Sequence, residues 1–256
     1  MGGTLVWTLH GTLHAVYALA NLLLLRSTWS VLSDPAFPGV GHLALKIVLA
    51  GLVYDNAVRV LTPPLLARGA AGARVAKALA TLSYCLHWCG LWGLFPLAYD
   101  LGRAVRCGRG APGGMRAAMY GAGGAALVAG AVDFVFLTRP TASLAVVEHF
   151  VPMVRYVRGK PGRGTGGLVP LATTVASLVA FVGLGAVVWW ERGEPGPLGA
   201  FAAVLGLYAL LPPTSVAERG REDPFTLARH LLPNGFEALL MHGICQCVSV
   251  ARAPCA

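Results

Sequence analysis

Three ionisable residues lie inside long apolar stretches of this chain: Asp55, His87 and Glu237. Placing such a side chain in an apolar segment of membrane length is costly, so it usually faces a polar interior and often marks a functional site. Carboxyl groups in apolar surroundings can also exchange protons near neutral pH. We therefore expect Asp55 and Glu237 to act as acid and base in catalysis, and His87 to assist them.

Further polar residues flank these groups or lie elsewhere in the chain where they could contact a substrate. They are Tyr54, Asn56, Asp133, Arg155, Tyr156 and Asn234. Arg155 and Tyr156 lie in a loop rich in arginine and lysine, which is typical of a segment that fixes membrane topology. A more specific hypothesis is that the basic residues of this loop bind the phosphate or pyrophosphate group of a ligand.

Each candidate also has a simpler structural explanation. Asp55 and Arg59 are four residues apart, so they can neutralise each other on one helix face. His10 and His14 also share a face, but hydrogen-bonded packing explains them better than a metal pair, because a metal site needs three or four ligands. Glu237 is the hardest to explain in this way, since no basic residue lies one turn away. We assign no metal site, and the sequence identifies no cofactor.

The elements that position these residues are expected to be membrane helices. Apolar residue types make up 56% of the 256 residues and charged types only 12%, whereas a soluble domain carries about 25% charged residues. Several apolar runs reach the roughly 20 residues needed to cross a bilayer, and no long polar stretch separates them. We therefore predict an all-α fold, with residues 1–256 forming one integral membrane domain, a bundle of about seven transmembrane helices.

Proline and glycine positions divide the chain into seven apolar segments. Pro63 and Pro64, for example, are expected to end the second helix. Small residues in the fourth segment repeat at spacings of four, which predicts close helix packing within the bundle. The predicted helices cover residues 4–26, 40–61, 78–101, 117–138, 168–190, 197–213 and 226–250.

Most of the ionisable residues lie at similar predicted depths. With a helical rise of about 1.5 Å per residue, Asp55 lies roughly 9 Å, His87 roughly 13 Å and Glu237 roughly 16 Å from the boundary on the N-terminal side. Asp133 lies at roughly 8 Å, whereas Lys46 lies at roughly 22 Å on the same scale. One polar cavity open toward the N-terminal side would explain this coincidence. Lys46 is expected to reach the opposite surface or to pair deeper in the bundle.

Arginine and lysine residues are more numerous around the loops on the N-terminal side than around the opposite loops. Because basic residues favour the cytoplasmic side, the N-terminus is expected to be cytoplasmic. The net charge of +9 is concentrated in short loops, where it favours anionic lipid headgroups. The sequence lacks the alternation of aromatic and basic residues that would indicate a protein that binds single-stranded nucleic acid. The expected partners are the lipid bilayer and a hydrophobic small-molecule substrate.

Two pairs of cysteines lie close together in the sequence. Cys245 and Cys247 could form a disulfide or bind a metal, although no second paired motif accompanies them. Cys85 and Cys89 lie one turn apart in an apolar run and are better explained as buried small residues.

Four short motifs carry a resemblance to other membrane proteins. They are Tyr54-Asp55-Asn56, Leu86-His87, Arg155-Tyr156 and Asn234-Gly235-Phe236-Glu237. Together they resemble a pattern in a family of uncharacterised multi-pass membrane proteins of high-GC bacteria and plants. The resemblance covers most of the chain and implies a multi-pass membrane protein, but it implies no activity.

Motifs of several enzyme classes are missing from the sequence, among them HExxH, GxSxG and the P-loop. The first hypothesis is a membrane-embedded enzyme that acts on a lipid or isoprenoid-like substrate through buried carboxylates. One alternative is a proton- or ion-coupled transporter, in which Asp55, Asp133 and Glu237 relay protons. Another is a non-catalytic scaffold subunit, in which the polar residues pair among themselves. An open pocket around Asp55, His87 and Glu237 would favour the enzyme.

Overall fold

The computed structural model describes residues 2–29, 40–108, 113–133, 135, 142–147, 153–158, 168–210 and 232–253. Within these ranges the chain is mainly helical, as the all-α prediction requires. The helices are α1 (Gly2–Trp29), α2 (Gly41–Leu66), α3 (Gly69–Gly90), α4 (Leu94–Val105), α5 (Gly113–Val132), α7 (Leu168–Arg192), α8 (Gly196–Leu210) and α10 (Pro233–Ala251), with a short 3-10 helix, η2 (Leu91–Gly93), between α3 and α4.

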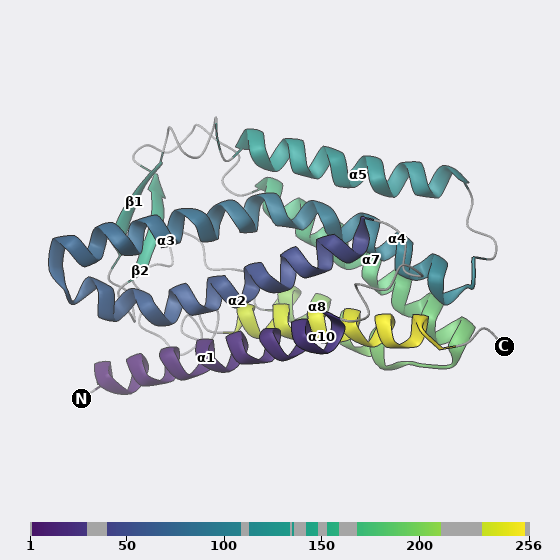
Figure 1. The fold of residues 1–256 in the computed structure, drawn as a ribbon, viewed down its shortest axis with the longest axis horizontal. Helices are drawn as coiled ribbons and strands as arrows, with labels where there is room; N and C mark the ends of the chain where they lie inside the picture. Colours follow the sequence, from purple (N-terminus) through teal and green to yellow (C-terminus); the bar gives the residue numbers. More distant parts are fainter. Residues whose placement is uncertain are drawn as a thin grey trace.

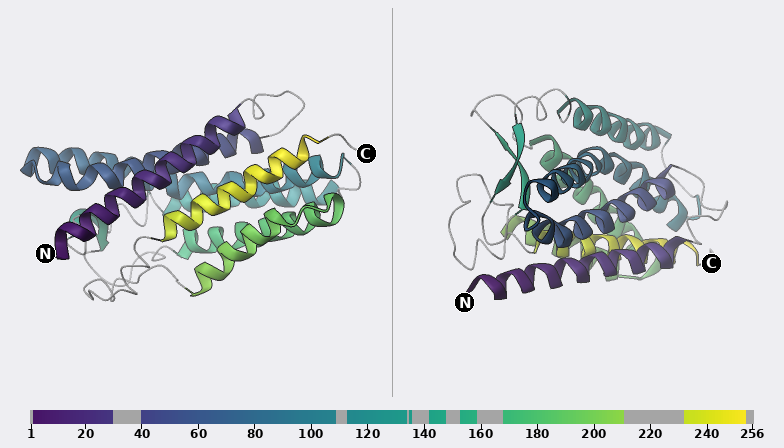
Figure 2. Two further views of the ribbon diagram at one scale, coloured as in Figure 1. Left: turned by 90° about the horizontal axis from the view of Figure 1, so that it is seen from below. Right: turned by 60° about the vertical axis from the view of Figure 1, so that its left-hand side comes forward.

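The helices form a bundle in which consecutive passes run in opposite directions (Figure 1). Since α3, η2 and α4 follow one another as one broken pass, the eight described α-helices make seven passes. The N-terminus and the turn between α2 and α3 lie at one end of the bundle, and the C-terminus lies at the other. Figure 2 shows α1 at the edge of the bundle, where it packs against α2 and α10.

The third predicted helix is wrong in its start and in its continuity. It was expected at residues 78–101, but α3 begins at Gly69, where a φ of +70° lets the chain reverse directly after α2. The pass is then interrupted by η2, where α2 comes very close: a Cβ added to Gly93 would lie 2.2 Å from the Cβ of Ala44. The earlier start places His87 nine residues farther from the beginning of its helix than predicted.

The prediction that Pro63 and Pro64 end the second helix is also wrong. α2 continues through both prolines to Leu66. The fixed φ of proline is helical, and the two missing N–H groups weaken the last turn without ending it. The N–H of Ala67 then donates to the carbonyl of Pro63 at 3.1 Å. Asp55 therefore lies five residues farther from the end of its helix than predicted.

The basic loop before α7 contains a hairpin that the sequence interpretation missed. Its antiparallel strands are β1 (Ala142–Val147) and β2 (Met153–Arg158). Arg155 and Tyr156 lie in β2, opposite Ala145 and Leu144 of β1. The hairpin packs against α3, and β2 also contacts α2 (Figure 2).

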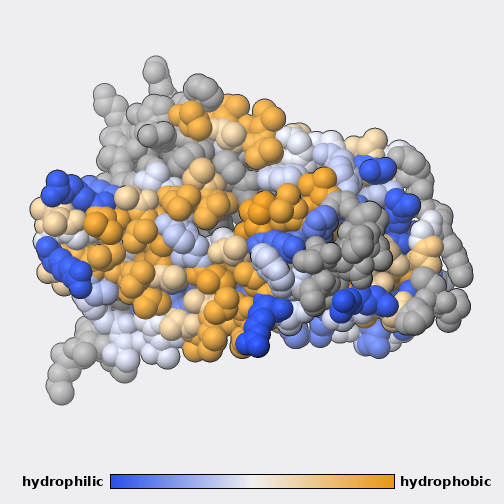
Figure 3. All heavy atoms as spheres, viewed as in Figure 1, coloured by the Kyte–Doolittle hydropathy of each residue, from blue (hydrophilic) through white to orange (hydrophobic). Residues whose placement is uncertain are grey.

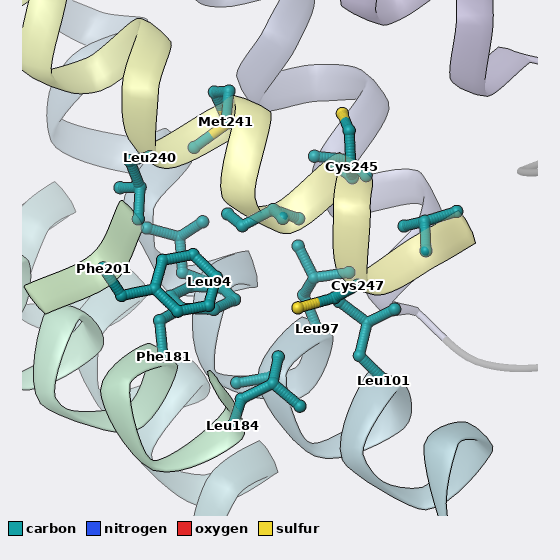
Figure 4. Close-up of a cluster of buried hydrophobic side chains, with 14 of the residues drawn as sticks. Leu94, Leu97, Leu101, Phe181, Leu184, Phe201, Leu240, Met241, Cys245 and Cys247 are labelled. Atoms are coloured by element: carbon teal, nitrogen blue, oxygen red, sulfur yellow. The ribbon is translucent and has the colours of Figure 1, made fainter. Parts of the chain in front are cut away.

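The largest hydrophobic core lies between α4, α7, α8 and α10 (Figure 4). Leu94 of α4 lies beside Phe181 of α7 and Phe201 of α8 there, and the two phenylalanine ring centroids are 5.3 Å apart. Cys247 of α10 points into the same cluster. Cys245 and Cys247 are both free, so they form no disulfide with each other, because residues two apart on a helix project in different directions.

Four polar side chains of α1 are buried in the bundle, whereas many of its large apolar side chains are exposed. His10, His14, Asn21 and Thr28 are at most 4% exposed, whereas Leu19 is 56% exposed. Large apolar residues are also exposed on α2, α3, α5 and α7. The face of the molecule drawn in Figure 3 accordingly carries a broad hydrophobic area.

Two helical segments in the described part of the chain are long and apolar enough to cross a membrane. They are Trp7–Trp29 in α1 and Ala172–Arg192 in α7. This finding rests on length and composition. α2 differs from these segments in carrying three charged residues, Lys46, Asp55 and Arg59.

Candidate functional site

Asp55 is the centre of a polar cluster that joins three helices. Its Oδ2 accepts hydrogen bonds from Nε of Arg59 at 2.9 Å and from Nδ2 of Asn234 at 3.1 Å. Its Oδ1 accepts a hydrogen bond from the Ser83 hydroxyl. The carboxylate of α2 is thus tied to α3 and α10 as well as to its own helix. The ion pair foreseen between Asp55 and Arg59 is confirmed.

Glu237 belongs to the same cluster through Arg59. It lies on α10, one turn after Asn234, and interacts electrostatically with the guanidinium of Arg59 and with Tyr208 of α8. Arg59 therefore sits under the influence of two carboxylates, Asp55 from its own helix and Glu237 from another. The sequence showed no basic residue one turn from Glu237, and the fold supplies one from α2.

The first turn of α10 brings Asn234 and Glu237 to this place. α10 begins at Pro233 rather than at the predicted residue 226. Proline is favoured at the start of a helix, where its missing N–H costs nothing. The predicted start of this helix is therefore wrong, and Glu237 lies in the second turn of the helix. Its level in the bundle follows instead from the contact between Asn234 and Asp55.

Asn56, next to Asp55 in α2, extends the cluster toward α1. Its Oδ1 lies 2.8 Å from Nδ1 of His14, and its Nδ2 donates to the carbonyl of Leu52 at 2.8 Å. The ring centroids of His10 and His14 are 4.4 Å apart. All three polar side chains are buried. The packing explanation for the two histidines is therefore supported by a specific hydrogen bond.

Close helix approach holds α1 against α10 beside His14. The ring of Tyr17 packs edge-on against His14 with centroids 5.9 Å apart. A Cβ added to Gly235 would lie 2.9 Å from the Tyr17 hydroxyl oxygen. Only glycine at this position allows the two helices to come so close.

Other residues predicted for the site have different places in the fold. The Tyr54 hydroxyl donates to the carbonyl of Leu79 at 3.0 Å, which joins α2 to α3. Asp133 is buried just beyond the end of α5, whose main neighbours are α3, α4, η2 and α7. Arg155 and Tyr156 lie in β2, and the placement of their side chains, like that of His87, lies outside the described part of the structure.

Three members of the cluster were missed or left out by sequence reasoning. Arg59 was considered only as a residue that neutralises Asp55. Ser83 gave no signal, because a serine in an apolar helix is usually bonded to its own backbone. His14 was noted but assigned to packing, although its spacing from His10 already placed both on one face. Lys46 lies away from the cluster: its ammonium group is 4.5 Å from the centroid of the Trp29 ring, at the end of α1.

The arrangement limits what each group can do chemically. The Asp55 carboxylate accepts three hydrogen bonds, so its main effect is to hold Arg59 and Asn234 in place. Among the described residues no group of three or more His, Cys, Asp or Glu side chains could hold a metal ion. A guanidinium that also interacts electrostatically with a second carboxylate, Glu237, is suited to binding an anionic or polar group, with Glu237 available to exchange a proton with it.

No protein-family model matches the chain, and no curated protein matches it. The function is therefore inferred from the geometry of the cluster itself.

Proposed function

We propose that this chain is a multi-pass integral membrane protein whose seven helical passes cross the bilayer. The distribution of side chains supports this: α1 buries His10 and His14 and exposes Leu19 and Leu23. A water-soluble helix in a globular protein has the opposite polarity. Lipid around the bundle removes the cost of the outward apolar side chains, and the interior supplies partners for the polar ones.

The end of the bundle that carries the N-terminus is the cytoplasmic end in this proposal. Cys107 follows α4, at the opposite end, and takes part in a disulfide. Disulfides persist in oxidising compartments rather than in the cytoplasm. Arg68 and Arg74 are exposed near the turn between α2 and α3, which agrees with the preference of basic residues for the cytoplasmic side.

We further propose that the cluster is the active site of an enzyme that acts on a lipid or isoprenoid-like substrate. The observation that supports this most is the ion pair of Arg59 with Asp55, together with the electrostatic interaction of Arg59 with Glu237. Asp55 is engaged by three donors and acts by holding Arg59, so Glu237 is the group that exchanges a proton with the substrate. Arg59 stabilises negative charge that develops beside it. A site inside a lipid-embedded bundle is open to substrates that dissolve in the membrane.

The test uses the full chain reconstituted in vesicles of phosphatidylcholine and phosphatidylglycerol. The vesicles contain either geranylgeraniol or geranylgeranyl diphosphate as probe, and mass spectrometry follows their conversion. We expect a product with the wild-type chain and with Glu194→Gln, an exposed control, and none with Glu237→Gln. Equal conversion by Glu237→Gln would overturn the assignment of Glu237, and absence of any product from the wild-type chain would overturn the enzyme.

The second candidate is a proton-coupled transporter. It is favoured by the row of buried titratable side chains that leads from His10 and His14 toward the Asp55–Arg59 pair. In the same vesicles a pH-sensitive dye would report proton entry driven by a gradient. Proton entry that is lost in Glu237→Gln, without conversion of either probe, would establish this function in place of the enzyme. If neither conversion nor proton entry is observed, the non-catalytic scaffold subunit remains.

A further inference from the structure

The hydrogen bonds of Asn56 fix the tautomer of His14. Because Nδ2 of Asn56 donates to the carbonyl of Leu52, the amide presents its Oδ1 to the imidazole. An amide oxygen accepts but cannot donate, so Nδ1 of His14 must carry a hydrogen. In the neutral ring the other nitrogen, Nε2, is then a hydrogen-bond acceptor.

This acceptor is buried and unused. His14 is 0% exposed, and its Nε2 has no hydrogen-bond partner among the described residues. Leaving a buried polar atom unpaired costs about 1–3 kcal/mol, and such atoms in native proteins usually have a protein or water partner. Where the described protein supplies none, a water molecule or a ligand can complete the hydrogen bond. Because Nε2 of His14 lies beside the cluster, we interpret its missing partner as a bound ligand.

The charged groups around His14 determine which kind of hydrogen-bond donor can bind to its Nε2. Arg59, His10 and Asp55 all act on the imidazole electrostatically, and Arg59 has the largest effect of the three. A cationic donor would be repelled by Arg59, whereas a neutral hydroxyl group would not. The helix that carries His14, α1, lies at the edge of the bundle with apolar side chains facing outward. A ligand that approaches from this side would come from the membrane.

We propose that Nε2 of His14 binds the hydroxyl group of a lipid-like alcohol in the site. This inference rests on the proposed function and adds a ligand-binding residue and a substrate class to it. The hydroxyl donates to Nε2, while the hydrocarbon part of the alcohol lies between α1 and the neighbouring helices. His14 then positions the hydroxyl oxygen on the side of the cluster that Arg59 and Glu237 share.

The experiment uses the full chain with ¹⁵N-labelled histidine in lipid nanodiscs. Farnesol is the probe, and farnesyl methyl ether, which has no donor hydrogen, is its matched control. The His14 signals are identified by their loss in His14→Phe. We expect the Nε2 resonance of the unprotonated nitrogen to move upfield on addition of farnesol and to stay in place with the ether. Farnesol binding is expected to weaken about fivefold in His14→Phe and to be unchanged in His242→Phe, an exposed control.

Several results would overturn the inference. If farnesol does not move the Nε2 resonance, farnesol does not bind this acceptor. This measurement needs only the wild-type protein. Equal shifts with farnesol and with the ether would show that the hydroxyl is not the recognised group. In the wild-type chain, a farnesol shift without conversion of the lipid probes overturns the enzyme and keeps the His14 site. Conversion of the probes without the shift does the reverse.

Discussion

Asn234 donates a hydrogen bond from Nδ2 to Oδ2 of Asp55 at 3.1 Å, across 179 positions of sequence. The same oxygen accepts the hydrogen bond from Arg59. The contact ties the first turn of α10 to the middle of α2, and it brings Glu237 to a level where it interacts electrostatically with Arg59. It is the structural basis of the candidate site, because without it the two carboxylates would belong to unrelated parts of the bundle.

Replacing Asp55 with alanine is expected to destabilise the folded bundle by about 3 kcal/mol, because it leaves the mostly buried charge of Arg59 without its partner. Removing both charges in Asp55→Ala/Arg59→Met is expected to recover most of this loss. The measurement is unfolding of the purified protein in mixed micelles with increasing SDS. A single variant as stable as the wild type would contradict the role of Asp55 in holding Arg59.

Replacing Asn234 with alanine is expected to cost about 1–2 kcal/mol, because a hydrogen bond to a charged acceptor between two helices is lost. The matched control is Asn21→Ala, whose amide donates to the carbonyl of Tyr17 within its own helix. Its effect on the free energy of unfolding is expected to be smaller. In a double-mutant cycle Asn234→Ala and Asp55→Ala are expected to be non-additive, and strict additivity would count against the contact.

Gly123 and Gly124 are neighbours in α5 with opposite surroundings. A Cβ at Gly123 would lie 2.8 Å from the carbonyl oxygen of Trp92, whereas a Cβ at Gly124 would meet nothing within 4 Å. Gly123→Ala is expected to destabilise the protein by about 1–3 kcal/mol through overpacking. Gly124→Ala is expected to be neutral or stabilising by up to about 1 kcal/mol through helix propensity. Thermal unfolding of the two variants in detergent compares them directly, and the reverse order would contradict the packing of α5.

The proposed topology places the α2–α3 turn and the α7–α8 turn on opposite sides of the membrane. Short glycosylation sequences inserted after Arg68 and after Gly193 test this in microsomes. With the N-terminus cytoplasmic, only the insertion after Gly193 is expected to be glycosylated. An insertion after Gly108 is expected to behave like the one after Gly193. Glycosylation at both Arg68 and Gly193 would contradict the number of passes between them.

Many of the helix positions could be predicted because they depend mainly on residues that are close together in the sequence. The apolar runs around α1, α7 and α8 gave helix positions within a few residues of those observed. The polar positions on α1 repeat every three to four residues or multiples of this, so His10 and His14 had to share one face. The close pairing of Asp55 and Arg59 also follows from helix geometry alone, since four residues make about one turn.

Helix ends were predicted less well because they depend on neighbours as much as on local residues. Pro63 and Pro64 fit within α2, Gly69 allows an immediate return into α3, and Pro233 starts α10 late. Each of these shifts changed the depth expected for an ionisable residue. The hairpin from Ala142 to Arg158 was missed since short strands next to a charged loop carry only a weak pattern.

The sequence by itself determined that the chain forms apolar helices and that a few ionisable side chains lie within them. Only the tertiary structure decided which of these side chains meet. Asp55 contacts Ser83 and Asn234, and His14 contacts Asn56, because the rotation and axial shift of each helix follow from packing across the whole bundle. Those two quantities depend on many small contacts between distant segments, and no local pattern of residues encodes them.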